Sequence, residues 1–377
     1  MKKKYIIITI CIILIICITT ILINKNKKEY IIQNGVMLAL TLDGEKISSY
    51  PEGRNYKIEI DCENGKGKWL VDEWKLAVEE VTGNVVCNLD FITRSNNDKL
   101  KTEVENKATA ITSTNNAGTT ETSNRYTGKQ PNNWIWFNNE MWRIIGSIPA
   151  CLNSSCSSKE NLVKIIRAES IGGLEYDGVP SNGYPTSIWG KNTLYDLLNN
   201  YYYGKKNPTG ASPCYGYSTY YGLCNYIEKG ISSEATDYYG KMIKAVYWNI
   251  GTLSKVTRTI EVTYGIETST VTSASIKIGI MAATDYGYAS GQTTAYLNEL
   301  SNYIGSNWLN SQGSGEWTMA SVSPSVGECA VVSPNGDVNS TNAGNNAAAV
   351  RPVVYLDPLV YVVSGDGTEG NPYQIGM

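Results

Sequence analysis

The residue types best suited to ligand binding gather in residues 212–225, with the sequence SPCYGYSTYYGLCN. Four tyrosines stand there among small residues: Tyr215, Tyr217, Tyr220 and Tyr221. A tyrosine ring offers a large contact area at low cost in rotamer entropy, and its face can stack on a sugar ring or an apolar patch. A disulfide that closes the segment would order it before a ligand arrives. This loop is therefore a candidate binding site; the alternative is that it packs on its own domain.

A second group of tyrosines, residues 201–203, ends a predicted helix and could join the same surface. Three consecutive residues cannot all face one side of a helix, so we expect at least one of these rings to be exposed. We count Tyr202 among the candidate ligand-binding residues. The alternative is that the run covers an edge of the core.

The composition argues against most catalytic chemistry. The 377 residues include no histidine, which excludes an imidazole base and histidine-ligated zinc. Five carboxylates lie near predicted loops: Glu169, Glu175, Asp177, Asp285 and Glu316. A glycosidase needs two such groups roughly 5–10 Å apart. We expect no enzyme activity and no cofactor, and leave open a hydrolase that uses acidic residues.

Several large or charged residues interrupt the apolar segments. Four tryptophans could form an aromatic platform for a sugar, although their apolar neighbours favour core packing: Trp134, Trp136, Trp142 and Trp189. Arg143 and Arg351 lie inside apolar strands, and we expect each to pair with a carboxylate such as Glu140 or Asp357. The oxygen-rich segment 366–371 favours a turn over a calcium site, so we expect no metal.

The nine cysteines suggest local disulfides. Two of them lie in an N-terminal apolar run and a third, Cys329, has no obvious partner. The other six form three neighbouring pairs: Cys62 with Cys87, Cys151 with Cys156, and Cys214 with Cys224. No C-x-x-C spacing favours thiolate zinc. Disulfides form in an oxidising compartment, which agrees with the apolar N-terminus.

The N-terminal run, residues 5–23, is 19 residues long and carries no charge. That length spans roughly the 30 Å hydrocarbon core of a bilayer and exceeds the apolar part of a signal peptide. We expect a single-pass protein of the cell membrane with its C-terminal domain extracellular; the alternative is a cleaved signal peptide. Six lysines fall within residues 1–28, leaving 26 basic and 35 acidic residues, a net charge of −9. A nucleic-acid partner is not expected.

The patterning divides the chain into four segments. Residues 1–28 are the predicted transmembrane anchor, and residues 30–92 alternate like the strands of a small disulfide-stapled β-sandwich or meander. Residues 93–124, rich in Thr, Asn, Ala and Ser, read as a flexible linker. Residues 125–377 mix strands with helices expected at 186–202, 235–251 and 294–310, which predicts an α+β fold. We also expect strands at 259–265 and 276–284, and pairing between the two ends of this domain.

Five motifs suggest a family: WFNNEMWRIIGSI, KIIRAE, IGIMAATDYGYAS, EWTMAS and VRPVVYL. Residues 125–365 resemble a C-terminal domain of unknown function that recurs in anchored surface proteins of low-GC Gram-positive bacteria. In outline that domain is similar to the C-type-lectin-like fold, in its formylglycine-generating-enzyme-like branch. Enzymes of that branch use cysteines near the C-terminal core strands. Residues 349–356 contain none, so the resemblance implies a scaffold for ligand-binding loops and not the oxidase chemistry.

Together these observations predict a membrane-anchored extracellular surface protein. Through the loops of a lectin-like α+β domain it would bind or display a glycan, a protein or a peptidoglycan ligand. Two alternatives stay open. One is a cell-wall hydrolase that works with carboxylates, and the other is a non-catalytic structural component of the envelope.

Overall fold

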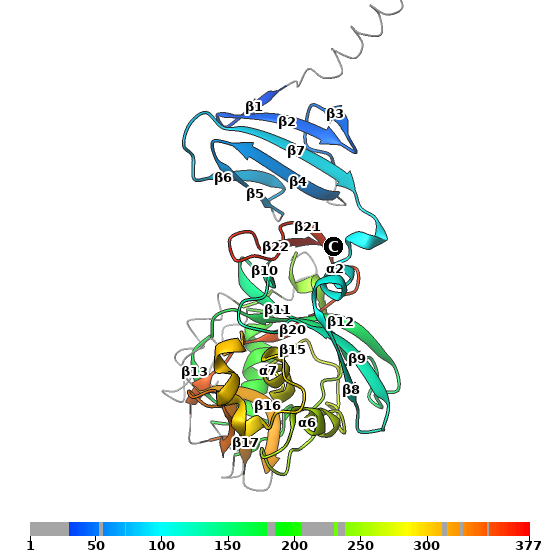
Figure 1. Ribbon diagram of the computed structural model, residues 1–377, viewed down its shortest axis with the longest axis vertical. Coiled ribbons are helices and arrows are strands. Elements are labelled where there is room, and N and C mark those ends of the chain that lie inside the picture. The colour runs from blue at the N-terminus through cyan, green and yellow to red at the C-terminus, as the bar shows by residue number, and fades with distance from the viewer. Residues whose placement is uncertain are drawn as a thin grey trace, which may run out of the picture. The chain divides into compact units, whose positions relative to one another are not determined.

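The computed structural model describes residues 30–52, 56–71, 73–178, 185–205, 230–232, 238–310, 315–323, 327–344 and 347–377 (Figure 1). The chain divides into two compact units, Met1–Arg94 and Ser95–Met377. The described part is mostly β, with 43% strand and 16% helix in several sheets. The prediction of an α+β fold with a C-type-lectin-like domain is therefore wrong.

The described residues of the first unit form one sheet and one hairpin. The sheet has the order β1-β2-β7-β4, with β3 paired to β2. Its strands are β1 (Ile31–Gln33), β2 (Val36–Leu42), β3 (Glu45–Ile47), β4 (Tyr56–Glu63) and β7 (Val86–Thr93). The hairpin consists of β5 (Lys66–Leu70) and β6 (Lys75–Glu79). Trp69 is fully buried and meets Phe91 edge to face, which gives this small unit its core.

The second unit is built on a ten-stranded sheet with the order β14-β20-β12-β11-β10-β22-β21. Strand β15 also pairs with β20, and the hairpin β8–β9 joins through β11. The bounds are β8 (Thr109–Thr114), β9 (Thr120–Arg125), β10 (Trp134–Phe137), β11 (Glu140–Cys151), β12 (Lys159–Arg167), β14 (Ile243–Lys244), β15 (Ile278–Gly279), β20 (Val353–Leu356), β21 (Tyr361–Ser364) and β22 (Tyr373–Gly376). The two ends of the domain meet where β10 pairs with β22, as the sequence predicts.

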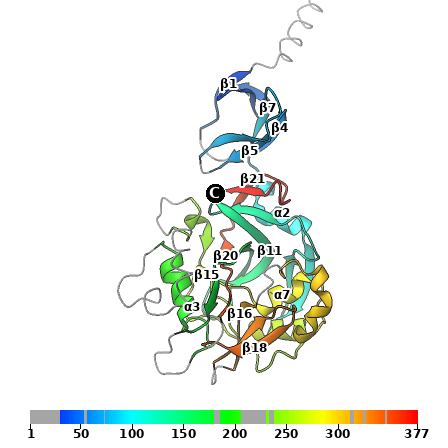
Figure 2. The ribbon, with the colours of Figure 1, turned by 90° about the vertical axis from the view of Figure 1, so that its left-hand side faces the viewer.

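A second sheet and several short helices complete this unit. The sheet runs β13 (Gly173–Glu175), β19 (Ala347–Ala349), β16 (Glu316–Ser323), β17 (Glu328–Val332) and β18 (Val338–Asn342). The helices are η1 (Asn96–Asp98), α2 (Leu100–Lys107), α3 (Thr193–Asp196), η2 (Leu197–Tyr202), η5 (Gly240–Met242), α6 (Ile260–Glu267), α7 (Ala283–Ala289) and η6 (Leu297–Ser306). In the view of Figure 2, strands β15, β20 and β16 lie between α3 and α7.

Three local predictions differ from the structure. Residues 93–124, predicted as a linker, contain α2 and the hairpin β8–β9. The segment 259–265, predicted as a strand, begins helix α6: the Thr259 side chain accepts from the backbone N–H of Val262, and Ile260 and Tyr264 are buried one turn apart. Within 235–251, the described residues form only η5 and then strand β14, which pairs with β20 at the sheet edge. Strand pairing decides the first and third cases, and a local N-cap decides the second.

Among the residues that the structure describes, no helix is long and apolar enough to cross a membrane. The longest is η6, with 10 residues, and a span needs about 20. This finding goes against the predicted single-pass localisation, which we do not retain. The apolar run at residues 5–23 lies outside the described residues.

Two of the three predicted disulfides are confirmed: Cys62 with Cys87, and Cys151 with Cys156. The first joins directly opposed residues of β4 and β7. Cys214 and Cys224 lie outside the described residues. Cys329 is a free, fully buried thiol on β17, and burial raises its pKa, so it is shielded from reaction.

Candidate functional site

The tyrosine loop lies outside the described residues, and with it Tyr215, Tyr217, Tyr220 and Tyr221. Its role stays a prediction. The described residues that flank the gap lie side by side, because Tyr203 bridges to Ile231 and the backbone N–H of Gly204 donates to the Ile231 carbonyl at 2.6 Å. Tyr202 is fully buried, and its hydroxyl has no hydrogen-bond partner in the described part of the chain. Buried there, Tyr202 cannot touch a ligand at the surface.

The carboxylates singled out from the sequence occupy separate places. Asp177 is buried and accepts from the backbone N–H groups of Thr186 and Thr193, at 2.6 and 3.1 Å, so it holds a loop in place. Glu169 is exposed, and Glu175 is half-buried, with a pKa raised by burial. The other two, Asp285 and Glu316, are buried beside cations.

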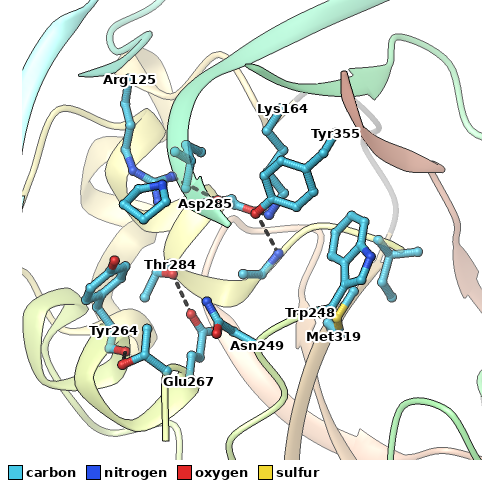
Figure 3. Close-up of a pocket in the computed structure, with 15 residues that line it drawn as sticks. Arg125, Lys164, Trp248, Asn249, Tyr264, Glu267, Thr284, Asp285, Met319 and Tyr355 are labelled. Atoms are coloured by element: carbon cyan, nitrogen blue, oxygen red, sulfur yellow. Dashed lines mark hydrogen bonds and ion pairs between the residues drawn. The ribbon is translucent and has the colours of Figure 1, made fainter. Parts of the chain in front are cut away.

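Asp285 belongs to a buried polar centre, which we define as Arg125, Lys164, Glu267 and Asp285 (Figure 3). These residues come from β9, β12, α6 and α7, and each is at most 4% exposed. The Asp285 carboxylate accepts from Arg125 Nη1 at 2.8 Å and from Lys164 Nζ at 2.5 Å. The enclosed cavity here measures about 30 Å³, room for a water molecule and not for an organic substrate.

The pKa values of the two carboxyl groups of this centre are shifted in opposite directions. Burial alone would raise the pKa of Asp285, but Lys164 and Arg125 outweigh it and lower that pKa to about 2. Burial raises the pKa of Glu267 to about 7, with a smaller contribution from the Asp285 carboxylate. Glu267 accepts from the backbone N–H of Ala283 at 2.9 Å and shares a short hydrogen bond with the Thr284 hydroxyl. The centre fastens two helices to the main sheet.

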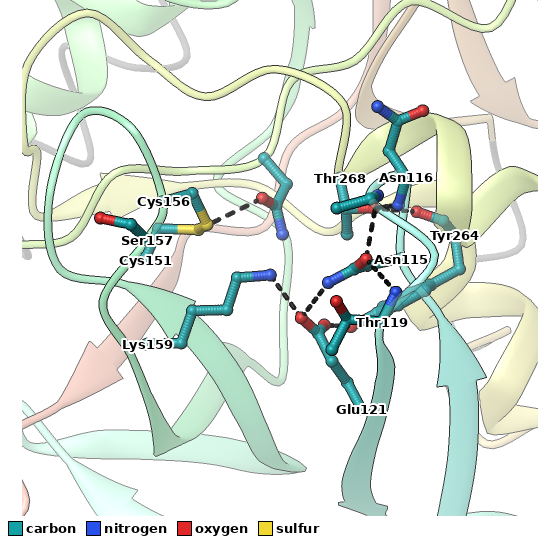
Figure 4. Close-up of polar contacts among 12 residues, drawn as sticks. Asn115, Asn116, Thr119, Glu121, Cys151, Cys156, Ser157, Lys159, Tyr264 and Thr268 are labelled. Atoms are coloured by element: carbon teal, nitrogen blue, oxygen red, sulfur yellow. Dashed lines mark hydrogen bonds and ion pairs between the residues drawn. A yellow bond between two sulfur atoms is a disulfide. The ribbon is translucent and has the colours of Figure 1, made fainter.

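A second polar cluster lies around Glu121 on β9 (Figure 4). Its carboxylate accepts from the Tyr264 hydroxyl at 2.6 Å and from Asn115 Nδ2 at 2.5 Å, and it forms an ion pair with Lys159. Burial opposes its ionisation, but these partners together lower the pKa of Glu121 below its ordinary value. With its hydrogen bonds taken up by the protein, this cluster is a structural tie between β9, β12 and α6.

The strongest candidate for ligand binding is an open pocket of about 420 Å³ around Arg143, which we call the Arg143 pocket. That volume is at the small end of the range for ligand sites. Besides the arginine, its lining includes two tryptophans, exposed amides and two exposed charges: Trp134, Trp308, Gln130, Asn132, Lys129 and Glu369. Trp134 and Arg143 are directly opposed on β10 and β11, and Trp308 follows η6.

The Arg143 guanidinium is held in place from three directions. Its Cζ lies 4.1 Å from the Trp134 ring centroid and 4.7 Å from that of Trp308. Its Nε donates to Oδ1 of the fully buried Asn133 at 2.6 Å. The Trp308 ring is fixed in turn, because its Nε1 donates to the carbonyl of Tyr126 at 2.7 Å. The arginine is thus ordered before any ligand binds.

Arg143 nevertheless keeps donor capacity. Besides the Nε bond, Nη2 makes one long bond to the Pro131 carbonyl at 3.5 Å. Of the five N–H groups of a guanidinium, this leaves three, two on Nη1 and one on Nη2, without a partner in the described ranges. No described carboxylate lies within 4.0 Å of it. Burial, with repulsion from Arg351, lowers the pKa of Arg143 to about 10 against the weaker, opposing attraction of Glu369, so it stays charged at neutral pH.

The expected partners of the two strand arginines are therefore wrong. Glu140 accepts from Arg167 at 2.6 and 2.9 Å and forms no ion pair with Arg143 in the described part of the chain. Arg351 has a carboxylate partner, but it is Glu316, at 2.7 and 2.8 Å, and not Asp357.

The four tryptophans for which core packing was favoured over a sugar platform lie in different environments. Trp142 and Trp189 are buried in the core, as their apolar neighbours indicate. Trp136 is half-buried, and Trp134 lines the pocket. Trp308, which comes from a distant segment, had no local signal that would link it to Arg143.

No protein-family model, curated protein or solved structure matches the chain. The resemblance to anchored surface proteins stays a prediction that rests on its motifs. Fold and site together define a mostly β chain of two units, the second of which carries a preordered arginine in an open, tryptophan-lined pocket.

Proposed function

We propose that this chain is a binding protein for acidic saccharides and that the Arg143 pocket receives the carboxylate-bearing sugar. The observation that carries the proposal is the Arg143 guanidinium, charged, half-buried and without an ion pair among the described residues. A carboxylate accepts two parallel hydrogen bonds from the planar end of a guanidinium, and such bonds are among the stronger ones in proteins.

The rest of the lining suits a sugar that bears one carboxylate. Lys129 and Arg143 contribute two positive charges and Glu369 one negative charge, a net of +1. The exposed amides of Gln130 and Asn132 can donate to and accept from ring hydroxyls. Trp308 is buried and both tryptophan rings pack against Arg143, so the exposed part of the half-buried Trp134 is what can contact the apolar face of a sugar.

The proposal is tested by ligand-observed NMR titration of the full-length chain with glucuronic acid, galacturonic acid and, as the neutral reference, glucose. The acids should bind and glucose should bind at least tenfold more weakly. Arg143→Gln should weaken acid binding tenfold or more, since a hydrogen bond to a charged group contributes about 1.5–3 kcal/mol. Arg143→Lys keeps the positive charge but loses the paired donors of the guanidinium. It should weaken acid binding to an intermediate extent.

Two variants control this experiment. Lys255→Gln removes an exposed charge outside the pocket lining and should leave acid binding unchanged. Glu369→Gln removes the acid that faces the pocket and should tighten acid binding. Equal affinity for glucose and glucuronic acid, or wild-type binding by a folded Arg143→Gln protein, would contradict the proposal.

A further inference from the structure

A second open pocket adjoins the first. It measures about 400 Å³, and we call it the Thr127 pocket. Both pockets have Gln130, Pro131 and Asn132 in their lining, so this segment is the ridge that separates them. A ligand that fills the Arg143 pocket and continues across the ridge would enter the Thr127 pocket directly.

The Thr127 pocket differs from its neighbour in charge. It contains two cations, but both are engaged: Lys107 Nζ lies 2.7 Å from Glu103 Oε1, and Arg125 is held by Asp285. Besides these paired cations it offers uncharged groups, namely the hydroxyls of Thr109 and Thr127, 3.5 Å apart, and the amides of the ridge. A neutral, hydroxyl-rich group fits this lining better than a second carboxylate does.

The ridge is anchored on both sides. Before it, the backbone N–H of Tyr126 donates to Ile145 at 3.0 Å, and that of Gly128 donates to Ala289 at 3.0 Å. After it, the Asn133 side chain donates to the Ile144 carbonyl at 2.8 Å. The two pockets therefore keep a fixed spacing, and a ligand of matching repeat binds both without ordering the protein first.

From this pairing we infer that the ligand is a linear oligosaccharide in which a uronic acid is joined to a neutral sugar. The uronic acid lies in the Arg143 pocket and the neutral unit in the Thr127 pocket, across the Gln130–Asn132 ridge. The inference rests on the proposed function and specifies its substrate class: an oligosaccharide of acidic and neutral units, not a single sugar.

The test compares three probes on the full-length chain: glucuronic acid, a trisaccharide with glucuronic acid between two N-acetylglucosamine units, and the all-neutral N-acetylglucosamine trimer. The central acid makes a neutral unit available in either chain direction. The acidic trisaccharide should bind at least tenfold more tightly than glucuronic acid. Thr127→Val, which replaces a hydroxyl by a methyl of similar size, should reduce affinity for the trisaccharide more than for the monosaccharide. Gln130→Ala, on the ridge that lines both pockets, should weaken binding of both acidic probes.

The outcomes separate the two proposals. Equal affinity for glucuronic acid and the acidic trisaccharide would overturn the chain inference and leave the proposed function intact. No binding of either acid would overturn both. If the neutral trimer bound as tightly as the acidic trisaccharide, both proposals would also be overturned, because Arg143 would then not discriminate an acidic ligand from a neutral one. Lys255→Gln is the matched control, and thermal unfolding of each variant verifies its fold.

Discussion

Replacing Glu267 by glutamine should change how the stability of the second unit depends on pH. Glu267 is 4% exposed, and its carboxyl lies against the Ala283 N–H and the Thr284 hydroxyl. A glutamine can keep both contacts, because its Oε1 still accepts from Ala283 and its Nε2 donates to Thr284. The variant thus imitates the protonated acid at every pH.

The size of the effect follows from the pKa of Glu267, which is about 7 in the folded protein against an ordinary value of 4.5. Between these values the folded chain holds a proton that the unfolded chain has released. The contribution of Glu267 to the free energy of unfolding must therefore fall as the pH rises from 4.5 to about 7, by about 3 kcal/mol in total. The facing Asp285 has a pKa of about 2 and stays ionised across this window, and the raised pKa of Lys164 keeps that group charged.

Denaturant unfolding at pH 4.5, 6 and 8, followed on the transition of the second unit, measures this difference. Wild type and Glu267→Gln should have similar stability at pH 4.5, and the variant should be more stable by about 3 kcal/mol at pH 8. Glu261 is an exposed acid on the same helix. The free energy of unfolding of Glu261→Gln should depend on pH as that of wild type does. Parallel curves for wild type and Glu267→Gln would refute the reasoning.

Two further substitutions test the framework around the sites. Cys87→Ser opens the disulfide with Cys62 and should lower the free energy of unfolding of the first unit by about 3–4 kcal/mol, measured without reductant; an unchanged midpoint would show that the bridge is dispensable. Glu316→Gln leaves the guanidinium of Arg351, 2% exposed, without its counter-charge and should cost about 3–5 kcal/mol in thermal or chemical unfolding. A loss below 1 kcal/mol would mean that water or another acid replaces the partner.

The features that the sequence predicts well are local. The apolar runs Trp134–Phe137 and Met141–Ile145 on either side of Asn138-Asn139-Glu140 predict a hairpin. Strands β10 and β11 form it, with a turn one residue shorter, because Asn138 and Asn139 both adopt positive φ, 54° and 60°, as a tight two-residue turn requires. The two confirmed disulfides likewise join cysteines that are close in sequence.

The features that the sequence predicts poorly depend on contacts between residues that are far apart in the chain. The hairpin β8–β9 looked like a linker because the side chains it buries include polar ones, such as Ser113 and Ser123, in place of an alternating apolar row. Ser113 is satisfied by the hydroxyl of Tyr288, 175 positions away at 2.7 Å. No window of the sequence shows that pairing.

Strand geometry explains why the expected arginine partners failed. Side chains on a strand alternate between its two faces, so Glu140 and Arg143, three positions apart on β11, point to opposite sides. Arg351 and Asp357 are separated by six positions, roughly 20 Å along an extended chain. Proximity in sequence predicts an ion pair on a helix, where positions three and four apart are neighbours, and not on a strand.

Arg143 differs from the buried cations of this unit in having no ion pair within 4.0 Å among the described residues. Arg125, Lys164, Arg167 and Arg351 each lie within 4.0 Å of a carboxylate. A charge withdrawn from water costs free energy unless a partner compensates it, and two tryptophan faces compensate only part of that cost. Where the other cations are neutralised by the fold itself, Arg143 stands at the wall of an open pocket with three donors to spare. Glu369 in the pocket lining offsets part of this charge, and we propose that an anionic ligand supplies the rest.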